Sequence, residues 1–110
     1  MTDHKIHTIN VHELKKCRDA DANLCLIDVR EDSEWQEQRI PGALHIPKDT
    51  LVNKIAAKVP AFETPIYLHC RGGVRSLTAA NYLIDLGYKN VYSVDGGITE
   101  WVRAGYPIEE

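Results

Sequence analysis

Short runs of apolar residues alternate along the chain with segments in which apolar residues recur at helical spacing. The run at residues 24–29 is nearly continuous in apolar side chains, as in a central strand that is covered on both faces. Residues 76–86 instead place Ala80 and Leu83 on one helical face, and Gly87 follows where a helix commonly ends. The pattern therefore predicts strands that alternate with helices.

Capping and turn residues set the expected ends of these elements. Asn10 and Glu13 have the spacing of a capping box, and Asp49 or Thr50 is expected to cap a later helix that Pro60 ends. The predicted strands are 6–9, 24–29, 43–47, 65–69 and 91–94, and the predicted helices are 11–18, one or two turns between 31 and 38, 51–59, 76–86 and 98–104.

The alternation of strands and helices predicts the fold class. Parallel neighbouring strands need crossover connections, which the intervening helices supply. We therefore expect an α/β fold, a three-layer sandwich with a mainly parallel five-stranded sheet and helices on both faces. The 110 residues correspond to a single domain, 1–110, that can bury a core without a disulfide or a metal.

Charge and cysteine content exclude several classes of protein. A net charge of −3 disfavours a general binder of nucleic acid or acidic membranes, because such proteins usually carry a basic excess. No run of about 18 apolar residues could span a bilayer, and the start of the chain has no apolar signal region. Three cysteines fit neither a disulfide framework nor a zinc site, which indicates a reducing compartment, and together these features predict a cytoplasmic location.

The segment after the fourth predicted strand carries the candidate chemistry, because ligands of parallel sheets bind outside the carboxyl ends of the strands. Cys70 ends the strand, and the backbone N–H groups of residues 71–75 are expected to curl around its sulfur while the next helix directs its positive end there. These features should favour the thiolate, which is the reactive form. The candidate site residues are Cys70, Arg71, Gly72, Gly73, Val74, Arg75 and Ser76.

Arginines and glycines complete the prediction for this loop. Gly72 and Gly73 permit a positive φ and a close approach of a ligand. Arg71 is expected to face an anionic substrate, and Arg75 is expected to fix the loop or bind the anion. The loop therefore predicts a reactive sulfur that meets a small anionic substrate.

Other polar groups are interpreted as supporting or structural. A lone buried carboxylate is costly, so Asp28 needs a partner, either Arg75 or Arg30, and Asp28 and Arg30 are candidate supporting residues. His69 precedes Cys70, but adjacent residues of a strand point to opposite faces, so its ring should point away from the sulfur. Cys17 and Cys25 are not followed by a glycine-rich loop of this kind, and they are expected to be structural. The histidines His4, His7, His12 and His45 show no common ligand spacing, so no metal site is expected.

Three blocks of the sequence resemble the rhodanese-like sulfurtransferases, in the same order and over residues 9–108. The match departs from the family at Gln38 and Arg39, where the family often has Gly-His. Arg39 would add positive charge if it lay near the mouth of the loop. The first matching block comprises residues 26–31, 34, 35, 40–43, 46 and 47. The second is the loop 70–76. The third comprises residues 94–98 together with Trp101, Gly105, Tyr106 and Pro107.

The resemblance implies a rhodanese-like fold and a thiosulfate sulfurtransferase. In such an enzyme Cys70 takes a sulfane sulfur from thiosulfate or a related donor, becomes a persulfide, and passes the sulfur to cyanide or a thiol, which is ping-pong covalent catalysis. The expected partners are therefore a small anionic sulfur donor and a cyanide or thiol acceptor, and a protein acceptor stays open. No metal or organic cofactor is required.

Two alternatives remain. A phosphatase or arsenate reductase also brackets a loop with cysteine and arginine, but the four residues between Cys70 and Arg75 make a smaller cradle than the loop of cysteine phosphatases. The other alternative is a persulfide relay or a non-catalytic protein-interaction module. Inactive rhodanese-like modules commonly lack the cysteine that this chain retains.

Overall fold

The computed structural model describes residues 5–110, so His4 and the other residues of 1–4 lie outside the described part. Within it, the strands form one sheet in the order β1-β5-β4-β2-β3, and every pairing is parallel. This confirms the predicted parallel five-stranded sheet. The strands are β1 (His7–Ile9), β2 (Cys25–Asp28), β3 (Leu44–His45), β4 (Ile66–His69) and β5 (Val91–Val94).

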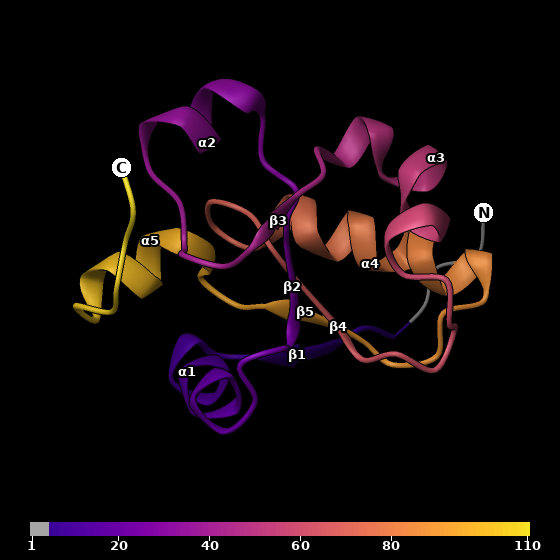
Figure 1. Cartoon of the computed structure of the whole chain (residues 1–110), viewed down its shortest axis with the longest axis horizontal. Coiled ribbons are helices and arrows are strands. Elements are labelled where there is room, and N and C mark those ends of the chain that lie inside the picture. Colours follow the sequence, from indigo (N-terminus) through magenta and orange to yellow (C-terminus); the bar gives the residue numbers. More distant parts are fainter. Residues whose placement is uncertain (1–4) are drawn as a thin grey trace.

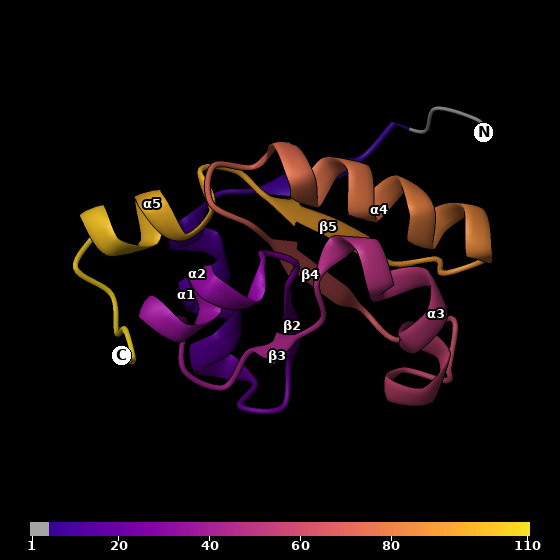
Figure 2. The same ribbon diagram turned by 90° about the horizontal axis from the view of Figure 1, so that it is seen from above.

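Helices cover both faces of the sheet, as predicted. Figures 1 and 2 show α3 and α4 together on one side and α1 on the other, with α5 beside the ends of the strands. The apolar residues of α1 and α5 belong to one buried cluster and those of α3 and α4 to another. The helices are α1 (Val11–Ala20), α2 (Asp32–Glu37), α3 (Lys48–Lys58), α4 (Val74–Leu86) and α5 (Gly97–Arg103).

The alternation of side chains along each strand divides the core between the two faces. Ile27 and Leu68 pack in the cluster with α3 and α4, whereas Leu26 packs in the cluster with α1 and α5. Cys70 continues the face of Leu68 and belongs to the α3–α4 cluster. The face on which a residue lies therefore follows from its register along the strand.

The predicted helix starts are partly wrong. Helix α4 begins at Val74, two residues before the predicted start at Ser76, because Gly73 takes the left-handed conformation (φ 111°) and turns the chain directly into the helix. Helix α3 begins at Lys48, with Pro47 rather than Asp49 or Thr50 at the N-cap position. The Pro47 carbonyl accepts the Thr50 N–H at 3.0 Å and so takes part in the first turn.

The first helix follows its prediction more closely. The Glu13 N–H donates to Asn10 Oδ1 at 2.8 Å, and the Asn10 N–H donates to Glu13 Oε1 at 3.0 Å, which confirms the capping box. The helix then continues to Ala20, two residues past the predicted end at Arg18. Of the described helices, none combines the length and apolarity that crossing a bilayer requires.

Candidate functional site

The site lies at the carboxyl end of β4, which runs between β2 and β5 in the sheet. Cys70 directly follows the last residue of β4, and the loop 70–73 carries the chain into α4. Because β4 is a central strand, the neighbouring parallel strands end beside it. Side chains from several segments therefore lie near the Cys70 thiol.

The Cys70 sulfur is buried and held by two neighbours. Its side chain is 1% exposed, the Gly73 N–H donates to Sγ at 3.1 Å, and Sγ lies 3.6 Å from Ser76 Oγ. Among the described residues, Gly73 supplies the one backbone N–H in hydrogen-bond range of Sγ, so the predicted curl of N–H groups from 71 to 75 is wrong in extent. Val74 and Arg75 form the first turn of α4, where N–H groups have no intrahelical acceptor, and among the described hydrogen bonds neither N–H donates to Sγ.

Ser76 links the loop to the next strand. Its hydroxyl donates to the Gly73 carbonyl at 3.1 Å and lies 2.7 Å from Ser93 Oγ of β5, and both serines are fully buried. Ser93 was not singled out from the sequence, although a lone serine within the apolar run of β5 was a signal. The pair anchors the side of the loop that faces Sγ.

Arg75 is committed to an ion pair with Glu34 of α2. Its Nη1 and Nη2 donate to the two carboxylate oxygens at 2.6 and 2.9 Å, and both side chains are about three-quarters buried. The hydrogen bonds from Arg75 lower the pKa of Glu34 to about 2, and those to Glu34 raise the pKa of Arg75. Arg75 therefore ties α4, the helix that follows the loop, to α2.

The partner of the buried Asp28 carboxylate is Arg30, so the alternative that Arg75 fills this role is wrong. Arg30 Nη2 donates to Asp28 Oδ2 at 2.8 Å, and the Arg30 Nε and backbone N–H also donate to the carboxylate. A second bond from Nη2 reaches the Gln38 carbonyl at 2.7 Å. The pair satisfies the buried charges and holds the end of α2 against β2.

His69 lies on the face opposite Cys70, as predicted. Its Nε2 is 3.6 Å from Asp28 Oδ2 and has no hydrogen-bond partner among the described residues. Complete burial lowers the pKa of His69 and favours the neutral ring. The ring therefore packs beside the Asp28–Arg30 pair instead of beside the sulfur.

The start of α5 packs directly on the backbone of the loop. The Ile98 N–H donates to the Cys70 carbonyl at 2.9 Å, and the Thr99 N–H donates to the Arg71 carbonyl at 3.1 Å. A Cβ on Gly97, which has φ 52°, would overlap the Cys70 carbonyl oxygen and lie 2.7 Å from that of Arg71. Glycine is therefore required at this position by both its conformation and its neighbours.

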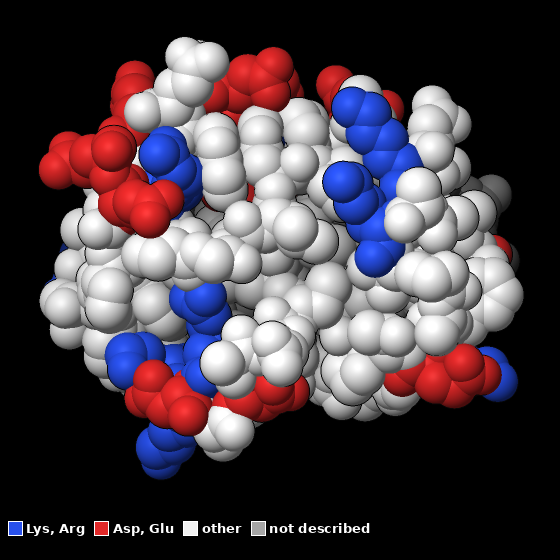
Figure 3. Space-filling model, in the orientation of Figure 1, with Lys and Arg blue, Asp and Glu red and all other residues white. Residues whose placement is uncertain are grey.

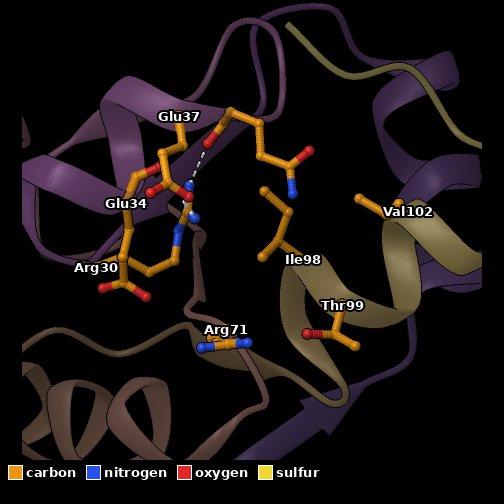
Figure 4. A pocket seen from close by; sticks show the side chains of 8 residues that line it. Arg30, Glu34, Glu37, Arg71, Ile98, Thr99 and Val102 are labelled. Carbon is orange, nitrogen blue, oxygen red and sulfur yellow. Dashed lines mark hydrogen bonds between the residues drawn. The ribbon is translucent and has the colours of Figure 1, made fainter. Parts of the chain in front are cut away.

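Arg71 is exposed and lines a pocket of about 300 Å³ between the loop, α2 and α5. Figure 4 shows Arg71 across this pocket from Glu37, with Ile98 and Thr99 on a third side. Acidic side chains gather over α2 and near the C-terminus (Figure 3). On the α2 side of the pocket, Glu34 and Glu37 lie together with Arg30 (Figure 4). The lining residues are Arg30, Glu34, Glu37, Gln38, Arg71, Ile98, Thr99 and Val102.

The remaining predicted residues lie around the loop. Gly72 and Val74 are exposed, with Val74 77% exposed, and Gly73 is buried. Arg39 donates to the Trp35 carbonyl and forms an ion pair with Glu109 in the C-terminal segment. It does not line the pocket.

The other two cysteines lie apart from these groups. Burial raises the pKa of Cys25 at the amino end of β2, and Cys17 lies in α1. All three thiols are free. Within residues 5–110, no three potential metal-ligating side chains are grouped as a metal ion would require.

Comparison with known proteins decides the family. Residues 10–104 match the family described as "Rhodanese-like domain". The chain belongs to the rhodanese-like family. It is 39% identical over 85 residues to the thiosulfate sulfurtransferase GlpE of Tolumonas auensis, a match that covers 77% of each chain.

Solved structures of rhodanese type share the fold. A thiosulfate sulfurtransferase of Pseudomonas aeruginosa superposes with a TM-score of 0.86 at 27% identity, over 96% of this chain and 20% of that one. A Rhodopseudomonas palustris protein described as a possible tyrosine phosphatase superposes with a TM-score of 0.84 at 28% identity, over 94% of this chain and 85% of that one. The rhodanese-like fold predicted from the resemblance is thereby confirmed.

Glu34→Gln should remove one charge of the pair with Arg75 and lower the free energy of unfolding at pH 7 by about 1–2 kcal/mol. Because folding depresses the pKa of Glu34 from 4.5 to about 2, the stability it adds is complete above about pH 5 and is lost as the pH falls through 2. Denaturant unfolding of both proteins from pH 7 to pH 2 measures the difference. A difference that stays constant over this range would contradict the role of the ion pair.

Gly97→Ala should destabilise the protein more than Gly105→Ala does. Both glycines have a positive φ, at 52° and 79°, but a Cβ at Gly105 meets nothing within 4 Å, whereas one at Gly97 meets the loop backbone. An alanine with positive φ lowers the free energy of unfolding by about 1–2 kcal/mol at either position. At Gly97 the overlap of the new Cβ with the loop backbone lowers it by about 1–3 kcal/mol more. Equal losses in urea unfolding would show that the loop and α5 are not in this contact.

Proposed function

We propose that this protein is a thiosulfate sulfurtransferase in which Cys70 carries the transferred sulfur as a persulfide. The observation that carries the proposal is the position of the Cys70 thiol at the carboxyl end of β4, with the Gly73 N–H on its sulfur and the exposed Arg71 next to it. The match to curated thiosulfate sulfurtransferases supports the same class of reaction.

The proposed reaction has two half-reactions on one sulfur atom. The Cys70 thiolate attacks the outer sulfur of thiosulfate, a bond forms between the two sulfurs, and sulfite leaves with the electron pair of the broken S–S bond. Cyanide or a thiolate then attacks the outer sulfur of the persulfide and restores the Cys70 thiolate. The sulfur changes partners without an external oxidant or reductant.

Each charged group near the loop has a place in this proposal. Arg71 is the exposed cation beside Cys70, so it is the group available to bind the dianionic donor. Gly73 N–H donates to the sulfur that becomes negative. Arg30 and Arg75 act indirectly, because their guanidinium groups hold Asp28 and Glu34.

The phosphatase alternative is less well supported by the geometry. Phosphate binding in a loop of this kind needs several donors around one anion. Arg75 has both terminal nitrogens on Glu34, and Gly73 supplies the single backbone donor to Sγ found among residues 5–110. The small cradle predicted from the loop length fits a sulfane sulfur better than a phosphoryl group.

A protein acceptor remains within the proposal. Cys70 is buried, so a protein thiol would have to reach it on a protruding segment. A persulfide relay would turn over small molecules poorly, and a non-catalytic interaction module would not turn them over, whereas the proposed enzyme turns them over. A reducing, cytoplasmic location stays a prediction from the sequence.

Incubation with thiosulfate should add the mass of one sulfur to Cys70, and cyanide should remove it, because the covalent intermediate precedes the acceptor. Intact-protein mass spectrometry followed by peptide mapping measures the gain, with Cys70→Ser as the control. Failure of a demonstrably free Cys70 to gain sulfur would overturn the proposal for thiosulfate. Turnover of an aryl phosphate that Cys70→Ser abolishes would support the phosphatase alternative.

Arg71→Ala should raise the KM for thiosulfate about tenfold, since a charge-assisted contact with the donor is lost, and should change stability little. Arg103→Ala is the matched control, because Arg103 is an exposed arginine of α5 that does not line the pocket. Steady-state kinetics of both variants measure the effect. Equal KM values for the two variants would remove Arg71 from donor binding.

A further inference from the structure

The pocket beside Arg71 holds two charged side chains whose charges are not used elsewhere in the described structure. Of the charged residues that line it, Arg30 is bonded to Asp28, and Glu34 is bonded to Arg75. Arg71 and Glu37 have no ion pair or side-chain hydrogen bond with any residue of 5–110. The pocket therefore presents one free cation and one free carboxylate.

Arg71 and Glu37 line different sides of a space of small-molecule size. Figure 4 shows Arg71 on one side of the pocket and Glu37 on the opposite side. The volume of about 300 Å³ is at the lower end of ligand pockets, and Ile98 and Val102 give it an apolar wall. A ligand that satisfies both charges must carry a negative and a positive group on one small body.

We propose that this pocket binds the α-amino-acid group of a low-molecular-mass thiol, which serves as the sulfur acceptor. Arg71 binds the carboxylate of the acceptor, and Glu37 binds its ammonium group. This inference rests on the proposed sulfurtransferase activity and names the class of acceptor. Glu37 is the residue that distinguishes a zwitterionic thiol from a thiol with a carboxylate alone.

Arg71 can bind the sulfur donor and the acceptor in turn, because the two bind in separate half-reactions. In a ping-pong cycle sulfite leaves before the acceptor binds, so Arg71 is free for the acceptor carboxylate. The acceptor thiol loses its proton to water, and its thiolate attacks the outer sulfur of the Cys70 persulfide. One S–S bond forms on the acceptor as the S–S bond to Cys70 breaks, and Cys70 leaves as the thiolate.

The kinetic test compares acceptors that differ by one charged group. L-Cysteine and L-homocysteine carry both groups, 3-mercaptopropionate lacks the ammonium group, and cysteamine lacks the carboxylate. Each acceptor is compared with itself in wild type and Glu37→Gln, which cancels differences in thiol reactivity. We expect Glu37→Gln to lower kcat/KM for cysteine, homocysteine and cysteamine about fivefold more than for 3-mercaptopropionate.

Glu63→Gln is the matched control, because it removes the same charge from an exposed residue that does not line the pocket. The same relative losses in Glu63→Gln, or an equal change for all acceptors in Glu37→Gln, would overturn the inference. Homocysteine is one methylene longer than cysteine, so the better of the two reports how far the thiol must reach from the pocket to Cys70.

A binding test separates this inference from the proposed function. S-Methyl-L-cysteine has the zwitterion but no thiol, and its N-acetyl derivative lacks the ammonium charge. Backbone NMR shifts around residues 37, 38, 71 and 99 should change when S-methyl-L-cysteine binds. The affinity should be several-fold lower for the N-acetyl derivative, and several-fold lower for S-methyl-L-cysteine in Glu37→Gln. Absence of binding, with persulfide formation and cyanide turnover intact, would overturn the acceptor class alone. Binding without persulfide formation would overturn the proposed function and leave the pocket as a zwitterion site.

Discussion

The backbone contact between the start of α5 and the Cys70–Arg71 segment sets the shape of the whole site. The N–H groups of Ile98 and Thr99 take the carbonyls of these two residues. Because a trans peptide is planar, a carbonyl that turns toward α5 turns the following N–H away from α5. The contact is close enough to exclude a side chain at residue 97, so the loop and the last helix are positioned together.

Two ion pairs decide which charged side chains of the pocket remain without a partner. Arg30 neutralises Asp28 in the interior, and Arg75 neutralises Glu34 between α4 and α2. Both pairs hold α2 against the strand ends, one through β2 and the other through the helix that follows the loop. Arg71 and Glu37 line the pocket without an ion pair among residues 5–110.

Local patterns predicted the elements better than they predicted the contacts between them. The capping box at Asn10 and the parallel order of short strands depend on neighbours in the chain or on period-two patterning, and both are confirmed. The early start of α4 was not predicted, because the spacing of the apolar residues indicates a helix only from Ser76, with Gly73 in the preceding tight loop. Its left-handed conformation instead caps the helix, which shortens the curl of N–H groups around the sulfur.

The sequence by itself determined the α/β class, the family and the position of Cys70 at a strand end, because these follow from periodicity, spacing and short motifs. It left Arg30 and Arg75 as alternative partners for Asp28, and it paired neither Glu34 with Arg75 nor Ser76 with Ser93. Those assignments needed the tertiary structure, since Glu34 and Arg75 are 41 positions apart and Ser76 and Ser93 are 17 apart. Side-chain partners across such separations depend on how helices and strands pack, which no local pattern encodes.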